Sequence, residues 1–174
     1  MTRATRQALY LTAEQFTTQF LEALRGSGLP SFRRKVRTAE VLLIDDLQFF
    51  AGKRATLVEL QHTIDSLLRQ GRQLILTADR PPNELGRLGP ELAARVSGGL
   101  VCGIEHADYE TRLGIARQMA VRSRRPIPEE VLQLVAAELT GDARRIAGAL
   151  HRLEAISEAL DQPVTLDFAR STLS

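Results

Sequence analysis

The 174-residue sequence has one cysteine, no tryptophan and only two tyrosines. The single cysteine, Cys102, excludes an internal disulfide and is typical of a protein of the reducing cytoplasm. Because Cys102 lies in an apolar run, we expect a buried, inert thiol. No apolar run approaches the ~18 residues of a membrane span, and the first ten residues lack the apolar core of a secretory signal. We therefore expect a cytoplasmic protein without a membrane span.

The sequence also lacks a strong excess of charge of either sign. Its net charge is +2, so the overall charge does not indicate a nucleic-acid partner. Only a local cluster of basic residues could indicate one. With few aromatic side chains for base stacking, any nucleic-acid binding would depend on backbone charge and on salt. The histidines His62, His106 and His151 are scattered without metal-ligand spacing, which predicts structural roles.

A third absence concerns phosphate binding. The 174 residues contain no Gly-x-x-x-x-Gly-Lys-Ser/Thr loop, whose backbone amides and lysine hold nucleotide phosphates. The only Gly-Lys pair is Gly52-Lys53. Leu47 stands five residues before Gly52 and Arg54 follows Lys53, so this pair does not match the loop.

The first part of the chain predicts alternating strands and helices. Thr12 and Gln15 form a capping-box pattern that predicts a helix start at Thr12. The stretch FRRKVR, residues 32–37, predicts a basic turn, and residues 73–78 predict a strand buried on both faces of a parallel sheet. The predicted strands are 7–11, 41–45, 73–78 and 99–104, and the predicted helices run from Thr12 to Gly26, over 56–70 and over 90–96. This order favours an α/β sheet with right-handed crossovers.

From Asp108 onward the sequence predicts helices alone. Their ranges are 108–121, 128–139, 142–160 and 166–173, and no strand pattern occurs among them. We therefore expect two domains: a partial α/β core over 1–106 and a helical subdomain over 107–174.

Two adjacent aspartates end the predicted strand in VLLIDDLQFF, residues 41–50. Asp45 and Asp46 repel each other unless a cation lies nearby, and Asp79 follows the next strand. Ligands of an open parallel sheet bind beyond the carboxyl ends of its strands. The pattern predicts a Mg²⁺-nucleotide site, in which Asp45 holds the metal through water, Asp46 orients the attacking water and Asp79 senses the γ-phosphate. The alternative is that Asp46 caps the next segment and Asp79 caps a turn.

Two arginines are candidates for phosphate contacts. Arg95 precedes the last predicted strand, and Arg144 lies in the first turn of the helix over 142–160. A guanidinium binds phosphate through two parallel N–H groups and stays charged. The alternative is that both are solvated surface arginines.

Several stretches between Tyr10 and Leu153 resemble, in order, the nucleotide-binding domain of the bacterial DnaA family of AAA+ ATPases. They are YLTAEQFTTQFLEAL, FRRKVRTAEVLLIDDLQFFAGK, LILTADRPPNEL, LAARVSGGL, DYETRLGIARQMA and ARRIAGALHRLEA. The resemblance implies an α/β, P-loop NTPase-like sheet followed by an all-α lid. By this likeness, Asp45 and Asp46 match the Walker B positions and Asp79 matches sensor 1. Arg95 matches the arginine finger, and Arg144 matches sensor 2.

The resemblance also implies a function. DnaA-family proteins bind ATP or ADP with Mg²⁺, assemble head to tail with other DnaA-type subunits and open the replication origin. In the family, the phosphate loop lies between a first strand and helix that precede the YLTAEQF stretch. We therefore expect a shortened copy, with a sheet lacking its first strand, with weak or absent nucleotide binding and without the duplex-reading helix-turn-helix domain.

The resemblance further implies contacts to single-stranded DNA. The corresponding places are Leu21 and the segment Lys53-Arg54-Ala55, where Ala55 stands at the family's basic position and the adjacent Arg54 is a candidate substitute, turned by about 100° on a helix. A second basic candidate is the cluster Arg33, Arg34, Lys35 and Arg37, for which a solvated face is the alternative.

Two other functions remain open at this point. A non-enzymatic regulator that binds the initiator through the AAA+ face is favoured by the missing phosphate loop, but disfavoured by the five retained residues Asp45, Asp46, Asp79, Arg95 and Arg144. A helicase-loader-like ATPase is disfavoured because the Leu-Gln-Phe-Phe and ARRIAGAL stretches fit the initiator better.

Overall fold

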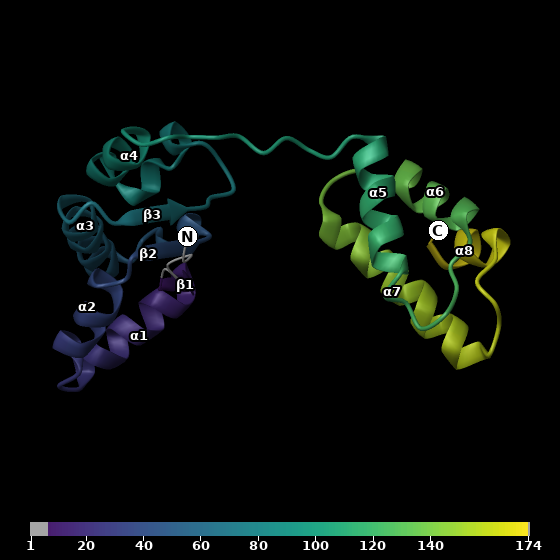
Figure 1. Cartoon of the computed structure of the whole chain (residues 1–174), viewed down its shortest axis with the longest axis horizontal. Coiled ribbons are helices and arrows are strands. Elements are labelled where there is room, and N and C mark those ends of the chain that lie inside the picture. The colour runs from purple at the N-terminus through teal and green to yellow at the C-terminus, as the bar shows by residue number, and fades with distance from the viewer. Residues whose placement is uncertain (1–6, 174) are drawn as a thin grey trace, which may run out of the picture. The chain divides into compact units, whose positions relative to one another are not determined.

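The chain forms two compact units, residues 1–103 and 104–174, in a computed structural model that describes residues 7–173 (Figure 1). The first unit contains all strands of the described residues, and the second contains helices only. The sequence places the boundary a little later, between 106 and 107, and the use of the two units as working domains stays a prediction. Among residues 7–173, none of the helices has the length and apolar character needed to cross a bilayer.

Three parallel strands form the sheet of the first unit, in the order β1 (Ala8–Thr12), β2 (Val41–Asp45) and β3 (Gln73–Leu76). The register sets Thr12 opposite Asp45, and Ile44 opposite Leu76. The carboxyl ends of all three strands therefore meet at one edge of the sheet. The predicted strands at 7–11 and 41–45 are confirmed to within one residue.

Helix α1 (Ala13–Arg25) begins where the sequence predicts it. The Thr12 hydroxyl accepts a hydrogen bond from the Gln15 backbone N–H at 3.1 Å, and the Gln15 side chain accepts one from the Thr12 N–H at 3.0 Å. This reciprocal pair satisfies two N–H groups that the helix cannot satisfy itself. It also places the helix directly after β1.

Residues 32–37 lie in a helix, so the prediction of a basic turn is wrong. Helix α2 (Leu29–Arg37) has Pro30 in its first turn and buries Phe32 and Val36, which are four residues apart. That spacing puts both side chains on one face of a helix. The turn prediction rested on the run of basic residues and did not use the spacing of Phe32 and Val36.

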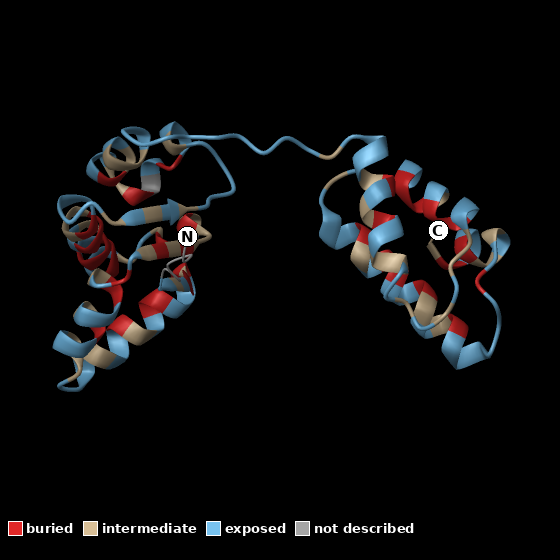
Figure 2. Ribbon diagram, viewed as in Figure 1, coloured by how far each residue is buried: buried red, intermediate tan, exposed pale blue. Residues whose placement is uncertain are grey.

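One hydrophobic core joins the sheet to its helices. Along β2, Leu42 and Ile44 are fully buried, while Leu43 is only partly buried because successive side chains point to opposite faces. The buried face packs against α1, α2, the 3₁₀ helix η1 (Leu47–Phe50) and α3 (Arg54–Arg69). The core also includes Leu85, Leu88 and Leu92, the last of which lies in α4 (Pro90–Ser97). Figure 2 shows the buried stripes of α1 and α3 turned towards the sheet.

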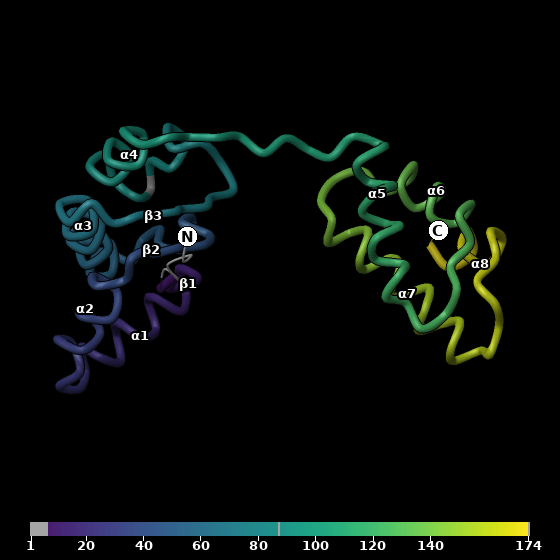
Figure 3. The backbone as a smooth tube through the Cα atoms, viewed as in Figure 1, coloured from purple at the N-terminus to yellow at the C-terminus, as the bar shows by residue number. Residues whose placement is uncertain are grey.

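The strand predicted at 73–78 forms as β3 over Gln73–Leu76, but its predicted burial on both faces is wrong, and so is the strand predicted at 99–104. β3 lies at the edge of the sheet and is not buried on both faces, since Ile75 is 42% exposed. Residues 99–104 form no strand, and the tube in Figure 3 runs through them without helix or strand. Leu100 and Ile104 are 94% and 99% exposed. A strand needs a neighbour to satisfy its backbone hydrogen bonds, and in the described part of the chain β3 pairs with β2 alone.

The second unit is a helical bundle with its own core. It comprises α5 (Tyr109–Ala120), α6 (Glu129–Glu138), α7 (Ala143–Leu160) and α8 (Leu166–Leu173). Asp108 and Asp142 cap α5 and α7 by accepting from Thr111 N at 2.8 Å and Arg145 N at 3.1 Å. The four helices match the four predicted from the sequence, because each has an apolar stripe that buries against the others.

Candidate functional site

The carboxyl edge of the sheet gathers polar side chains from all three strands. Asp45 ends β2, Asp46 follows it, and Thr77 and Asp79 follow β3. Thr77 continues the β3 pairing, because its backbone N–H donates to the Ile44 carbonyl at 3.0 Å. We refer to this edge as the acidic edge, meaning Asp45, Asp46 and Asp79.

Asp45 accepts hydrogen bonds from hydroxyl groups of both neighbouring strands. The Tyr10 hydroxyl donates to Oδ2 at 2.8 Å, and the Thr77 hydroxyl donates to Oδ1. Tyr10 lies opposite Leu43, two residues before Asp45 on the same face of the sheet, so it reaches Asp45 as a diagonal neighbour. The hydrogen bond to Asp45 is the main cause that raises the pKa of Tyr10. Tyr10 therefore stays protonated and remains a donor.

Asp46 has a left-handed backbone, with φ 64° and ψ 53°. Aspartate is one of the few residues with a side chain that tolerates this conformation. Its backbone N–H donates to the Thr77 hydroxyl at 3.0 Å, and its Oδ1 accepts from Gln48 Nε2 at 2.8 Å. Asp46 occupies the N-cap position of η1, but its side chain makes no capping hydrogen bond there. The strained turn and the fixed carboxylate are typical of a functional position.

Gln48 connects the tips of β2 and β3. Its side-chain NH₂ donates to Asp46, and its Oε1 accepts from the Asp79 backbone N–H at 3.3 Å. Asp79 also accepts two hydrogen bonds of 2.8 Å from Arg80, and this contact lowers the pKa of Asp79. Asp45, Asp46 and Asp79 thus lie at or just past the ends of neighbouring strands at one edge of the sheet, and their joint role as one site stays a prediction.

The acidic edge fits a magnesium ion held partly through water. Mg²⁺ typically uses one or two protein carboxylates and takes its other ligands from water and phosphate. Asp45 and Asp46 supply such a pair, and they accept hydrogen bonds from the hydroxyls of Tyr10 and Thr77 and from the side-chain amide of Gln48. Within residues 7–173 there is no group of three or more His, Cys, Asp or Glu side chains suited to a metal. Two carboxylates match the number that a nucleotide-bound Mg²⁺ typically takes from the protein.

The predicted phosphate-binding arginines have carboxylate partners. Arg95, on α4, pairs with Asp65 of α3 at 2.8 Å. Arg144, in the first turn of α7, is 94% exposed and lies 3.3 Å from the Asp142 carboxylate. Arg144 belongs to the helical unit, and its predicted role as sensor 2 stays a prediction.

The predicted contacts to DNA lie on exposed or partly exposed positions of the first unit. Leu21 of α1 is 36% exposed, Lys53 precedes α3 and is partly buried, and Arg54 is exposed in the first turn of α3. Gly52 supports this turn with φ 79°, a left-handed conformation that glycine adopts without strain. The DNA role of these residues stays a prediction.

The second basic candidate is divided by the structure. Arg33 and Arg37 clamp Glu59 of α3, with distances of 2.7 and 2.6 Å, and Glu59 is only 3% exposed. Arg34 and Lys35 are exposed on the other side of α2. Arg33 and Arg37 therefore form an ion-pair network between α2 and α3. Neither of the two predicted roles, a nucleic-acid contact or a solvated face, describes this network.

Several residues that shape the site were missed from the sequence. Tyr10, Gln48 and Thr77 contact the acidic edge, and Asp65 contacts Arg95. Thr77 was detectable in principle, because it lies one residue past β3 and two before Asp79. The others depend on the register of the strands and on which helices pack together, which no local pattern encodes.

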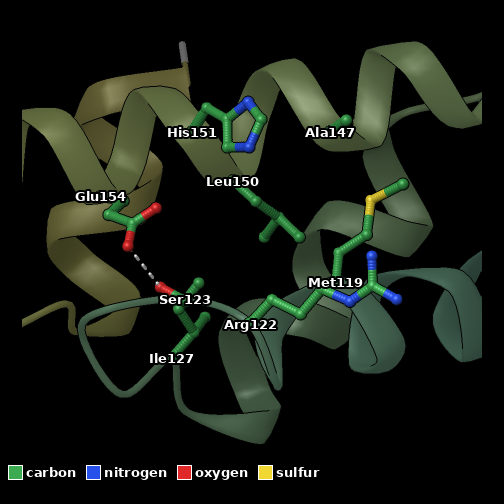
Figure 4. Close-up of a pocket in the computed structure, with 8 residues that line it drawn as sticks. All are labelled: Met119, Arg122, Ser123, Ile127, Ala147, Leu150, His151 and Glu154. Atoms are coloured by element: carbon green, nitrogen blue, oxygen red, sulfur yellow. Dashed lines mark hydrogen bonds between the residues drawn. The ribbon is translucent and has the colours of Figure 1, made fainter.

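Two further features belong to other parts of the chain. Cys102 is exposed, so the prediction of a buried thiol is wrong. The reason is that its segment forms no strand. In the helical unit, a pocket of about 200 Å³ is lined by apolar side chains, among them Leu150, and by the polar side chains of Arg122, His151 and Glu154 (Figure 4). Glu154 is held there by the Ser123 hydroxyl at 3.0 Å.

Comparison with known proteins identifies the family. The α/β unit with its parallel sheet, followed by a helical unit, has the AAA+ fold of domain III of the Thermotoga maritima replication initiation protein DnaA. The two structures match with a TM-score of 0.90 and 35% sequence identity, over 97% of this chain and 71% of that one. The family model of the bacterial DnaA ATPase domain matches residues 2–103. The chain belongs to this family.

Two other similar proteins are longer than this chain. The chromosomal replication initiator protein DnaA of Levilactobacillus brevis is 38% identical over 164 residues, which are 94% of this chain and 36% of that protein. A structure of the replication initiator DnaA bound to AMPPCP and single-stranded DNA matches with a TM-score of 0.76 and 26% identity, over 90% of this chain and 50% of that one. The chain thus spans about a third of the length of the curated relatives it matches.

Proposed function

We propose that the chain is a DnaA-type AAA+ module for ATP-dependent initiation of chromosomal replication, acting in a head-to-tail oligomer of DnaA-type subunits at origin DNA. The observation that carries this proposal is the acidic edge, where Gln48 joins the Asp46 carboxylate to the Asp79 backbone. Support also comes from the solved relative that binds AMPPCP and single-stranded DNA.

The roles follow from the chemistry of each side chain. Asp45 holds the nucleotide's Mg²⁺ through water, and Asp46 orients the attacking water with its Gln48-bound carboxylate. Asp79 senses the γ-phosphate. Arg95 acts on the nucleotide of the neighbouring subunit, and Arg144 contacts the nucleotide of its own subunit. Arginine suits both roles because it stays charged and binds phosphate through paired N–H groups.

We further propose that these 174 residues alone bind ATP weakly, because they contain no phosphate loop. One lost charge-assisted hydrogen bond costs about 1.5–3 kcal/mol, and the loop supplies several. Titration of the chain with labelled ATP and Mg²⁺ tests this, and saturable micromolar binding would refute it. The matched positive control is a chimera that carries the first strand and phosphate loop of the Levilactobacillus brevis relative. In that chimera, Arg144→Ala should weaken nucleotide binding.

The second candidate function is a regulator without ATPase activity of its own. It is favoured by the absent phosphate loop, and it requires that the chain bind an initiator through its AAA+ face. Mixing the chain with the ATP-loaded Levilactobacillus brevis protein separates the two functions. If the chain is a regulator, it should change the oligomerisation of that protein, and the chimera should hydrolyse no ATP. If the chain is an initiator module, the chimera with its restored phosphate loop should hydrolyse ATP.

Single-stranded DNA binding is proposed for Leu21, Lys53 and Arg54. Each phosphate contact contributes about 0.7 to the slope of log K against log salt for a single strand. Lys53→Ala with Arg54→Ala should therefore flatten the slope by about 1.4, measured by fluorescence anisotropy of a labelled oligonucleotide. The matched control is Arg152→Ala with Arg170→Ala, which removes two exposed arginines of the helical unit. An unchanged slope in the first variant would rule out this surface.

A further inference from the structure

Arg95 is attached to the long helix α3 by a two-point ion pair. Its Nε donates to Asp65 Oδ1 at 2.8 Å, and its Nη2 donates to Oδ2 at 3.2 Å. This parallel arrangement restricts a guanidinium in both position and orientation. The side chains of Arg95 and Asp65 are 33% and 31% exposed, so the pair lies at the surface without being fully solvated.

The ion pair with Asp65 leaves some N–H groups of Arg95 available to bind another group. Nη1 donates to the Glu91 carbonyl at 3.2 Å. A guanidinium has five N–H groups, so the partners in the described part of the chain account for three of them. One N–H remains on each of Nη1 and Nη2. Two neighbouring N–H groups of this kind are what a phosphate group binds.

The two helices differ in how firmly they are held. α4 is eight residues long and follows a stretch of short 3₁₀ helices, η2 (Pro82–Glu84) and η3 (Gly86–Leu88). α3 is sixteen residues long and buries Leu60, Ile64 and Leu67 in the core of the first unit. Asp65 therefore attaches Arg95 to the longer helix, which buries more side chains, and sites need such support to hold their geometry.

We propose that Asp65 is a positioning residue for Arg95: it fixes the guanidinium so that the two remaining N–H groups can meet a phosphate of the nucleotide bound to a neighbouring subunit. This inference rests on the proposed function, in which Arg95 acts on the neighbour's nucleotide. Asp65 itself does not touch the phosphate. The hydrogen bonds from Arg95 lower the pKa of Asp65, so the carboxylate is charged at neutral pH.

The test is a mixing experiment with a partner that carries its own nucleotide. The Levilactobacillus brevis relative is loaded with labelled ATP, and phosphate release is measured in a single turnover at rising concentrations of this chain. Arg95→Ala should abolish the stimulation. Asp65→Asn should lower the maximal stimulated rate by about tenfold or more, because small errors of position carry large kinetic costs. The concentration giving half-maximal stimulation should stay the same, and Asp65→Glu should restore part of the rate.

The control is Glu84→Gln, which removes an exposed carboxylate of η2 and should leave the rate unchanged. All variants are compared at a temperature at which circular dichroism shows them folded. A wild-type rate for Asp65→Asn, together with an inactive Arg95→Ala, would overturn the positioning role while keeping the role of Arg95. A faster rate, or a change confined to the half-maximal concentration, would also overturn it. If the wild-type chain gives no stimulation, the proposed role of Arg95 fails and the positioning role fails with it.

Discussion

The Tyr10 hydroxyl donates to Asp45 across 2.8 Å and so joins the tips of β1 and β2. Thr77 adds a second hydroxyl from the β3 side. Hydrogen bonds to both carboxylate oxygens restrict the rotation of the Asp45 side chain. The first aspartate of the pair is thus fixed in place by the sheet itself.

The Tyr10–Asp45 contact predicts a shifted phenol titration. In a Tyr109→Phe background, Tyr10 is the remaining tyrosine, and its absorbance change should have a midpoint above the ordinary 10.0. The cause is that an ionised Tyr10 would lose its hydrogen bond to the charged Asp45. Asp45→Asn should move the midpoint back towards the ordinary value, and Asp46→Asn should move it less. Equal midpoints in the Tyr109→Phe background and its Asp45→Asn variant would show that the contact is absent in solution.

Glu59 should make a large contribution to the stability of the first unit. Glu59→Gln leaves Arg33 and Arg37 without their shared carboxylate, and breaking a fully buried pair costs about 3–5 kcal/mol. Both arginines are partly exposed, with 42% and 27% of their side chains accessible. We therefore expect a smaller loss of about 2–3 kcal/mol in urea denaturation. Glu22→Gln, at an exposed position of α1, is the control and should change little.

The same network predicts an acid-dependent loss of stability. Burial alone raises the pKa of Glu59, but the hydrogen bonds and charges of Arg33 and Arg37 outweigh it and hold the pKa below 4.5. A carboxyl group with a lowered folded-state pKa stabilises the fold above its unfolded-state pKa and loses that effect as pH falls through the folded value. The difference in unfolding free energy between the wild type and Glu59→Gln should therefore shrink as pH drops below 4.5. A difference that is constant with pH would contradict the ion-pair explanation.

Cys102 should react readily in the folded protein. Its thiol is exposed, in a segment without helix or strand, and access is one of the main limits on thiol reactivity. A maleimide reagent should label it at nearly the rate found for the urea-unfolded chain. The chain has one cysteine, so Cys102→Ser gives the background. Labelling that is many-fold slower in the native protein would show that the segment is covered in solution.

The predictions from sequence succeeded where the deciding signal is local. The start of α1 follows from Thr12 and Gln15 alone, since a capping box involves residues three apart. The strand at 41–45 and the aspartates after it follow from one apolar run and its end. The gathering of Asp45 and Asp79 at one edge then requires only that parallel strands end on the same side.

The failures concern features that depend on a distant partner. Residues 99–104 have the composition of a strand, but composition supplies no neighbouring strand to pair with. The solvated face expected for Arg33 and Arg37 is also wrong, because both pair with Glu59, which lies more than twenty residues away. Asp65 was missed for the same reason, because its significance comes from Arg95, thirty residues further along.

The uncovered stretch between Gly99 and His106 has a practical consequence for the integrity of the protein. Proteases bind several residues in extended form, and this stretch joins two units that each keep a separate hydrophobic core. A single cut beside Leu100 would therefore leave both cores whole while severing the covalent connection between the acidic edge and Arg144.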